Sequence, residues 1–205
     1  MPLLPIYTYG QPVLRKRAKP VKKVDAEFRR FVDDMFETMN HANGIGLAAN
    51  QVGSLDRVIV IDISDVDDKK HEGVGEAATE ADVKPSVQEK KLVLVNPEVV
   101  SSGGEWKMEE GCLSIPEIRD EVERAETIRV KYKDLDFIDN EIEASGLLAR
   151  VLLHEIDHLN GILFIDRLGL VKRKLLRGRL NRIQKGQVTV SYPVLTAEDL
   201  GTVVR

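Results

Sequence analysis

The sequence predicts an α+β fold in which antiparallel strands pack around a central helix, with one helix before them and a basic helix after them. Apolar residues recur at helical spacing in two segments, one near the start of the chain and one after residue 145. Between these segments lie short runs rich in β-branched residues, which are typical of strands. The expected strands lie near residues 57–63, 91–100, 127–133 and 138–144.

The first helix begins at about Asp25, because an aspartate side chain can cap the free N–H groups at the start of a helix. The residues after it present apolar side chains at helical spacing, and we expect these in the protein core rather than at a ligand site. This apolar side consists of Phe28, Phe31, Val32, Met35, Phe36 and Met39.

The central helix carries the pattern HEIDH inside the apolar-periodic segment that runs from Gly146 to Gly161. His154 and His158 are four residues apart, so their imidazoles project from the same helix face and can bind one cation. Glu155 then lies beside the metal, where its carboxylate can accept a proton from a water molecule whose pKa the metal has lowered. The pattern therefore predicts a metal-binding helix whose chemistry is hydrolysis.

Two histidines leave a catalytic metal short of one protein ligand. The position of a third histidine in the metzincin pattern is Phe164, and the next glutamate after Glu155 is Glu198, near the C-terminus. Cys112, the only cysteine, is the remaining candidate, because a thiolate binds zinc or ferrous iron strongly. Two alternatives stay open, a buried small apolar cysteine and a nucleophilic Cys/His pair. The residues before the cysteine suit a tight polar turn better than a core: Glu109, Glu110 and Gly111.

Three segments together resemble the motifs of the peptide deformylase family. They are GIGLAANQ at residues 44–51, EGCLS at residues 110–114 and HEIDH at residues 154–158. The resemblance spans nearly the whole chain and implies an enzyme that removes the formyl group from the N-terminal formylmethionine of newly made polypeptides, releasing formate. By the same resemblance, Cys112, His154 and His158 hold the metal, Glu155 is the general base, and the Gln51 side chain and the Leu113 backbone amide form the oxyanion hole.

The resemblance also implies the cofactor and the substrate pocket. Fe²⁺ is the expected cofactor in bacterial cells, with Zn²⁺, Ni²⁺ or Co²⁺ able to occupy the same site. The peptide would run along Gly46 and Gly111, and Arg119 would reach towards its later residues. Arg150 lies one turn before His154, so its charge would narrow the pocket or lie across its mouth. The methionine side chain would contact Ile45, Met108, Leu147, Val151 and His154. Glu110 would pair with Arg124 to brace the cysteine segment.

The expected C-terminal helix, residues 168–186, is strongly basic in an otherwise acidic protein. The resemblance implies that this helix approaches the ribosome, where RNA phosphates would attract it. The alternative is a solvated helix face with Leu175, Leu176, Leu180 and Ile183 packed inward.

The chain of 205 residues has a net charge of -4 and is 42% hydrophobic, which fits a single catalytic domain over residues 1–205 in the cytoplasm. No apolar run is long enough to cross a membrane. A charged, glycine-containing insertion at residues 64–90 is expected to form a mobile surface loop. Two other functions stay open, a general metalloendopeptidase and a nonenzymatic zinc-stabilised ribosome-binding module.

Overall fold

The computed structural model describes residues 3–64 and 91–199. Its main sheet has five antiparallel strands in the order β2 (Gly46–Ala48), β3 (Val58–Asp62), β4 (Lys91–Gly103), β7 (Thr127–Lys133) and β8 (Asp139–Ser145). A separate antiparallel hairpin joins β5 (Trp106–Cys112) to β6 (Ile115–Arg124). The predicted α+β class with antiparallel strands is therefore confirmed. Nearly all of the predicted insertion lies outside the described residues.

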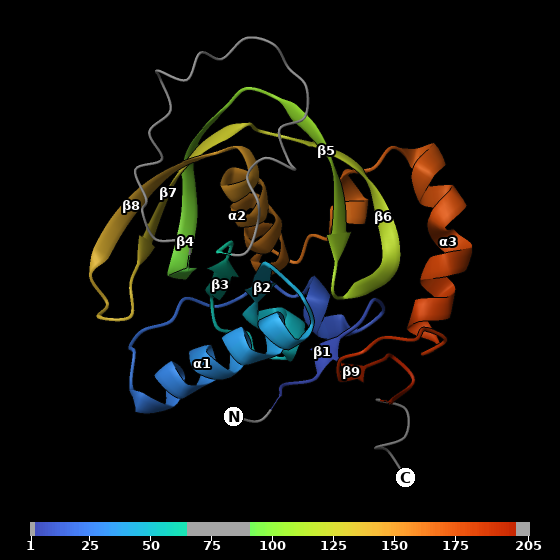
Figure 1. The fold of residues 1–205 in the computed structure, drawn as a ribbon, viewed down its shortest axis with the longest axis horizontal. Coiled ribbons are helices and arrows are strands. Elements are labelled where there is room, and N and C mark those ends of the chain that lie inside the picture. Colours follow the sequence, from blue (N-terminus) through green and yellow to red (C-terminus); the bar gives the residue numbers. More distant parts are fainter. Residues whose placement is uncertain (1–2, 65–90, 200–205) are drawn as a thin grey trace.

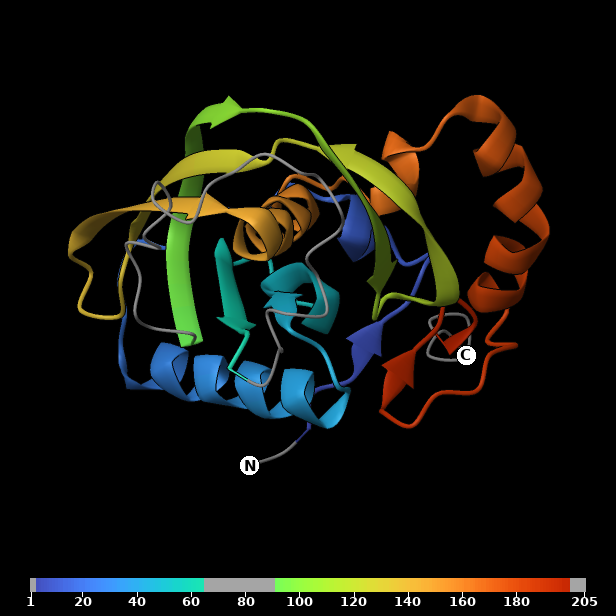
Figure 2. The same cartoon turned by 45° about the horizontal axis from the view of Figure 1, so that its top comes forward.

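Helix α2 (Gly146–Leu159) lies between the main sheet and the β5–β6 hairpin, as Figures 1 and 2 show from two directions. One core cluster joins it to the sheet, because Val151, Leu152 and Ile156 pack with Ile59, Leu94 and other strand residues. The helix is buried along most of its length. A helix held on two sides in this way presents its polar residues in fixed positions.

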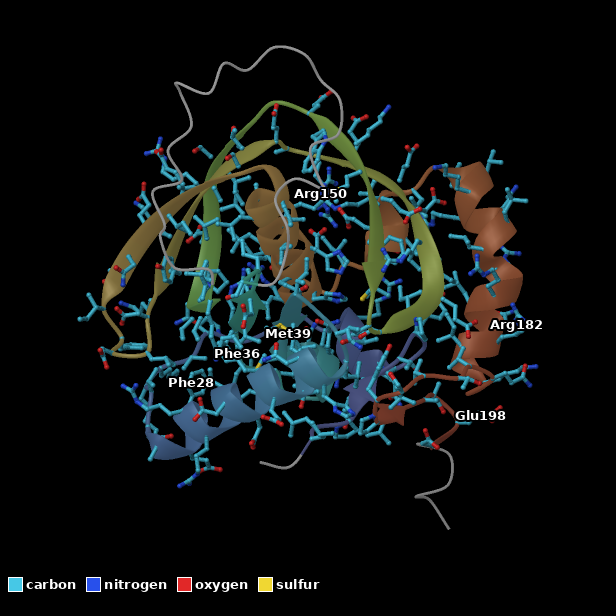
Figure 3. All side chains as sticks on the ribbon, viewed as in Figure 1. Phe28, Phe36, Met39, Arg150, Arg182 and Glu198 are labelled. Atoms are coloured by element: carbon cyan, nitrogen blue, oxygen red, sulfur yellow. The ribbon has the colours of Figure 1, made fainter. Side chains whose placement is uncertain are left out.

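Helix α1 (Ala26–His41) covers the end of the sheet formed by β2 and β3. Asp25 caps it, since its carboxylate accepts a hydrogen bond of 3.0 Å from the Phe28 amide. Phe36 and Met39 are buried against the sheet, and Figure 3 shows both on the inner side of the helix. The structure thus places this apolar side of the helix in or against the core, as the sequence predicts.

The last helix, α3 (Leu170–Gln184), lies on the outer side of the β5–β6 hairpin. Leu176, Leu180 and Ile183 are buried in a third core cluster, together with residues of β6 and of the short helices η1 (Pro12–Arg15) and η4 (Phe164–Arg167). Leu175, which is expected to pack inward in the alternative interpretation of this helix, is instead 77% exposed. Among the described residues, no helix is long and apolar enough to cross a membrane.

After α3 the chain turns back to form β9 (Val194–Leu195), which pairs in parallel with β1 (Ile6–Tyr7). Figure 2 shows this pair beside the tip of the β5–β6 hairpin. The two ends of the described chain therefore meet near the same place in the fold.

Candidate metal centre

Three potential metal ligands meet where α2 faces the end of β5. The ligand atoms of Cys112, His154 and His158 all lie within 4.8 Å of one another. Cys112 Sγ is 3.2 Å from His158 Nε2, and the two imidazole rings are 5.0 Å apart between centroids. One thiolate and two imidazoles with space beside them are the donor set of an open catalytic site for zinc or iron. The residues present therefore fit a divalent transition metal.

The structure differs from the sequence analysis in how it places the cysteine. Glu109 and Gly111 belong to strand β5, which ends at Cys112. The turn of the hairpin is formed by the two residues after Cys112, Leu113 and Ser114. Successive side chains of a strand point to opposite faces, so Glu109 is exposed to solvent while Glu110 is buried. Cys112 itself is partly exposed at the end of the strand, next to the hairpin tip.

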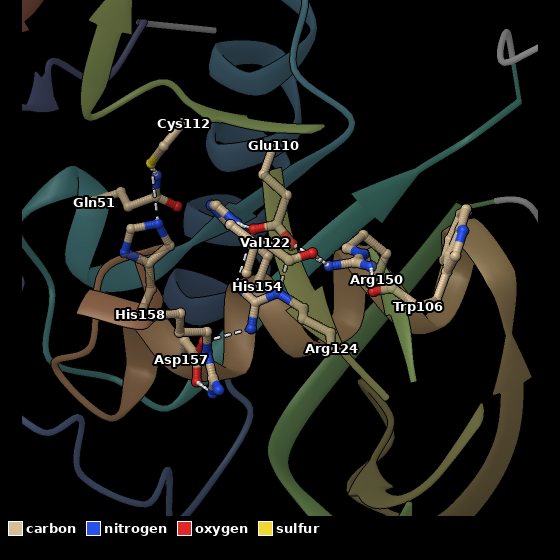
Figure 4. Close-up of polar contacts among 11 residues, drawn as sticks. Gln51, Trp106, Glu110, Cys112, Val122, Arg124, Arg150, His154, Asp157 and His158 are labelled. Carbon is tan, nitrogen blue, oxygen red and sulfur yellow. Dashed lines mark hydrogen bonds and ion pairs between the residues drawn. The ribbon is translucent and has the colours of Figure 1, made fainter. Parts of the chain in front are cut away.

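Glu110 connects the strand that carries the cysteine to the helix that carries the histidines. Its Oε2 lies 2.9 Å from His154 Nδ1, while Arg124 and Arg150 donate to its oxygens at 2.6 to 2.9 Å (Figure 4). Burial opposes ionisation of Glu110, but the hydrogen bonds from His154 and Arg124 outweigh it and hold its pKa far below the usual value. The ionised carboxylate can only accept, so His154 Nδ1 donates and Nε2 is left for the metal.

The same network continues to the other side of α2. Arg124 also donates to Asp157 Oδ2 at 2.6 Å, and Arg167 donates to both oxygens of Asp157 at 2.6 Å. Arg124, Glu110 and Asp157 are all buried. Since a buried charge is tolerated only with partners, these contacts lock the hairpin, helix α2 and η4 into one arrangement. The expected Glu110–Arg124 pair is thus present and is part of a larger cluster.

Arg150 does not lie across the mouth of the cavity. Its guanidinium is buried, donates to Glu110 Oε1 at 2.8 Å and to the Val122 carbonyl at 2.9 Å, and also contacts the Trp106 carbonyl. The Trp106 ring lies 5.1 Å from the guanidinium carbon. Figure 4 shows Arg150 between Glu110 and Trp106. Its charge is therefore balanced within the network, and its side chain forms part of the cavity wall.

His154, Glu155 and His158 of HEIDH have different protonation properties. Burial disfavours the charged form of His154, but hydrogen bonds to Cys112 and Glu110 raise its pKa to about 10. Burial and the neighbouring charge of His154 lower the pKa of His158 well below its usual value. Burial raises the pKa of Glu155 to about 7, and Glu155 Oε2 has no hydrogen-bond partner among the described residues. A carboxylate with such a pKa can both accept and return a proton at neutral pH.

Gln51 lies in the short helix η2 (Ala49–Val52), directly after β2. Its Oε1 accepts from the Ala48 amide at 2.8 Å, which fixes which end of the side-chain amide faces the site. Its Nε2 therefore points at Cys112 Sγ, 3.6 Å away, and at Ser114 Oγ, 3.3 Å away. A neutral donor held beside a metal site is what a developing oxyanion requires.

Two glycines of the segment 44–51 have close neighbours that the sequence alone did not reveal. A Cβ atom on Gly46 would lie 2.6 Å from Glu155 Oε1 and 2.8 Å from Val151 Cγ1. A Cβ atom on Gly44 would lie 2.8 Å from the Leu113 side chain. Glycine at these positions thus lets strand β2 approach helix α2 closely, and lets the segment just before β2 approach the hairpin tip.

One cavity of about 900 Å³ contains nearly the whole candidate site. Arg119 lines it with a largely exposed side chain, and His158 is the one predicted metal ligand that does not line it. The other predicted residues in its wall are Ile45, Gly46, Gln51, Met108, Gly111, Cys112, Leu113, Leu147, Arg150, Val151, His154 and Glu155. Residues 189–192, from the segment after α3, also line it and were not predicted. No residue pattern in that segment signals a site.

Comparisons with known proteins give one consistent family. The family model of polypeptide deformylases matches residues 3–174. A peptide deformylase of Salinibacter ruber is 42% identical over 198 residues, covering 96% of each chain, and one of Chlorobium phaeovibrioides is 45% identical over 195 residues, covering 95% of this chain and 94% of the relative.

Solved structures agree with the sequence relatives. The peptide deformylase of Legionella pneumophila superposes with a TM-score of 0.74 at 42% identity, covering 91% of this chain and 98% of that one. The enzyme of Thermus thermophilus gives 0.75 at 38% identity, with 90% and 99% covered. A structure from Ehrlichia chaffeensis in complex with actinonin gives 0.75 at 35% identity, with 92% and 100% covered.

Proposed function

This chain belongs to the peptide deformylase family, and we propose how its own residues carry out the reaction of that family. The enzyme removes the formyl group from the N-terminal formylmethionine of newly synthesised polypeptides and releases formate. It is a metalloenzyme, and one cluster of described residues could bind the metal. Neither the metalloendopeptidase nor the nonenzymatic binding module is favoured, because the family relationship extends over nearly the full chain.

In our proposal Cys112, His154 and His158 hold a single divalent ion, and Fe²⁺ is the ion in the cell. The bound metal lowers the pKa of water and polarises the formyl carbonyl. Glu110 keeps the Nδ1 proton of His154 in place, so that the other ring nitrogen faces the metal. The observation that carries the proposal is the meeting of these three ligands beside a cavity into which Glu155 also faces, with its Oε2 unpartnered among the described residues.

Glu155 is the proposed general base and acid. Oε2 of its carboxylate takes a proton from the attacking water and returns it to the departing amine nitrogen of methionine. The Gln51 Nε2 group and the Leu113 amide donate hydrogen bonds to the oxygen of the formyl group as negative charge develops there. The hydrogen bond from the Ala48 amide keeps Gln51 oriented for this task.

The substrate pocket is proposed from the same cavity. The methionine side chain lies against Ile45, Met108, Leu147 and Val151, and Arg150, which is also part of the cavity wall, is held in place by its hydrogen bond to Glu110. The peptide backbone passes Gly46 and Gly111, with Arg119 near its later residues. We also propose that actinonin, with which the Ehrlichia chaffeensis structure is in complex, would occupy this cavity.

The decisive experiment measures formate release from a formyl-Met tripeptide. Protein is purified anaerobically and loaded with Fe²⁺ or Ni²⁺, and an unblocked peptide of the same sequence serves as the control. Formate from the wild type but not from Glu155→Ala, with the unblocked peptide intact, supports the proposal. Cleavage of the unblocked peptide, or full activity of Glu155→Ala, contradicts it.

We also propose that residues 1–205 act as one catalytic domain in the cytoplasm, and that α3 contacts the ribosome. Exposed basic side chains on α3 include Lys174, Arg177 and Arg182, the last labelled in Figure 3. Phosphate contacts make affinity fall steeply with salt. Changing these three residues to glutamine should weaken ribosome binding and flatten its salt dependence, while the matched set Lys16, Lys22 and Arg30 changed to glutamine should not. Equal affinities for both sets would reject docking through α3.

A further inference from the structure

The segment after α3 is fixed to the body of the protein. We call residues 186–199 the C-terminal arm. Its strand β9 pairs with β1, and the Pro193 and Leu195 carbonyls accept hydrogen bonds of 2.9 and 3.0 Å from the amides of Ile6 and Thr8. The buried Gln11 side chain donates to the Thr196 carbonyl at 2.5 Å. The arm is therefore held by backbone pairing on the side where it approaches the cavity.

The arm reaches the hairpin tip that joins β5 to β6. The Tyr192 hydroxyl donates a hydrogen bond of 2.9 Å to the Leu113 carbonyl. The Tyr192 ring packs against the core cluster of α1, β2 and β3, which also contacts the Leu113 side chain. Tyr192 lines the cavity that contains Cys112 and Glu155. An aromatic side chain held in this way is a rigid support for the tip.

The tip has two further attachments, and both come from other parts of the fold. The Tyr9 amide donates to the Ser114 carbonyl at 2.8 Å, and Gln51 Nε2 lies 3.3 Å from Ser114 Oγ. Leu113 and Ser114 form the whole turn, and the proposed metal ligand Cys112 immediately precedes them. The Leu113 carbonyl, in turn, accepts its hydrogen bond from the Tyr192 hydroxyl, so Tyr192 holds the residue that directly follows Cys112.

From this arrangement we propose that Tyr192 is a positioning residue of the active site. It fixes the hairpin tip, so that Cys112 and the Leu113 amide keep their positions relative to the metal and to Gln51. The inference rests on the roles proposed above for Cys112 and Leu113. A donor contributes to oxyanion stabilisation only when it is fixed within a narrow range of position before reaction. Burial raises the pKa of Tyr192 to about 12, so its hydroxyl remains a donor throughout the neutral range.

The test compares Tyr192→Phe with Tyr9→Phe in the full-length, metal-loaded enzyme. Tyr192→Phe keeps the ring packing and removes the hydroxyl. Tyr9→Phe also removes one phenol hydroxyl, but the contact of Tyr9 with the tip is made by its backbone amide and is kept. Steady-state kinetics use a formyl-Met tripeptide, and thermal unfolding checks that each variant is folded.

We expect kcat of Tyr192→Phe to fall about fivefold, the effect of one lost neutral hydrogen bond, with KM unchanged and Tyr9→Phe equal to the wild type. The sulfur-to-metal charge-transfer band of the Co²⁺-loaded protein should also shift in Tyr192→Phe, because it reports the position of the Cys112 thiolate. An unchanged kcat, an effect on KM alone, or an equal loss in Tyr9→Phe would overturn the inference. Failure of the wild type to release formate would instead reject the proposed function.

Discussion

Glu110 Oε2 and His154 Nδ1 are joined by a hydrogen bond of 2.9 Å, which links strand β5 to helix α2 beside the candidate metal site. Glu110 is two residues before Cys112, so one carboxylate connects the segments that supply the thiolate and the imidazoles. Both partners are buried, and two arginines neutralise the carboxylate. Outer-shell contacts of this kind orient a metal ligand and raise its basicity.

Glu110→Gln should weaken metal binding without abolishing the fold. The amide loses the negative charge that holds the His154 Nδ1 proton and that balances Arg124 and Arg150. We expect the dissociation constant for Zn²⁺ to rise about 10- to 100-fold, as is usual when an outer-shell partner is lost. Competition with a coloured chelator measures this directly. Glu109→Gln, at the neighbouring exposed position, is the control, and equal effects of both variants would contradict the assigned role of Glu110.

Arg150→Met should lower the free energy of unfolding. The variant removes a buried cation and leaves the carboxylate of Glu110 with one arginine fewer, while the Val122 and Trp106 carbonyls lose a donor. Breaking a buried pair by removing one partner costs about 3 kcal/mol or more. Urea unfolding of the metal-loaded protein provides the measurement. Arg119→Met, which alters an exposed arginine, should change stability by less than about 0.5 kcal/mol. Similar losses in the two variants would show that Arg150 is not a structural member of the network.

Metal binding should strengthen as the pH rises through the neutral range. In the metal-free protein the pKa of His154 is raised to about 10, because hydrogen bonds to Cys112 and Glu110 outweigh burial. At neutral pH its imidazole is therefore cationic, with a proton on both ring nitrogens. The nitrogen that would bind the metal must lose its proton first. Each proton released on binding tightens the apparent dissociation constant about tenfold per pH unit.

Chelator competition between about pH 6 and pH 9 should reveal this slope. Glu110→Gln removes one of the groups that raise the pKa of His154, so its slope should be shallower. Affinity that is independent of pH in the wild type would contradict the prediction.

Some of the candidate site follows from local sequence alone. His154, Glu155 and His158 lie within one helical turn and a half, so their spacing determines their relative positions once α2 forms. Gln51 and Cys112 are distant along the chain, and no periodicity connects them to α2. The need for a third metal ligand made Cys112 a candidate, and only the resemblance to a family brought Gln51 into the same site.

Other parts could not be predicted because tertiary contacts decide them. Arg150 is close to the histidines in sequence, but its direction is set by Glu110 and by two carbonyls of a hairpin whose fold no local pattern revealed. Tyr192 and Leu113 are 79 residues apart, and the β1–β9 pair that brings them together has only two residues in each strand. Such short strands give no detectable alternation.

Glu155→Gln should nearly abolish turnover while leaving metal content unchanged. The amide has almost the same shape as the carboxylate, so the close approach of Gly46 to this side chain is kept, whereas the capacity to accept a proton from water is lost. We expect kcat to fall at least about 100-fold, the usual effect of removing a general base. Formate release measures kcat, and atomic absorption measures the metal. Glu141→Gln, an exposed change on β8, should behave as the wild type. If Glu155→Gln loses the metal, the residue is a ligand or a support for one, and the assignment of Glu155 as the base is wrong.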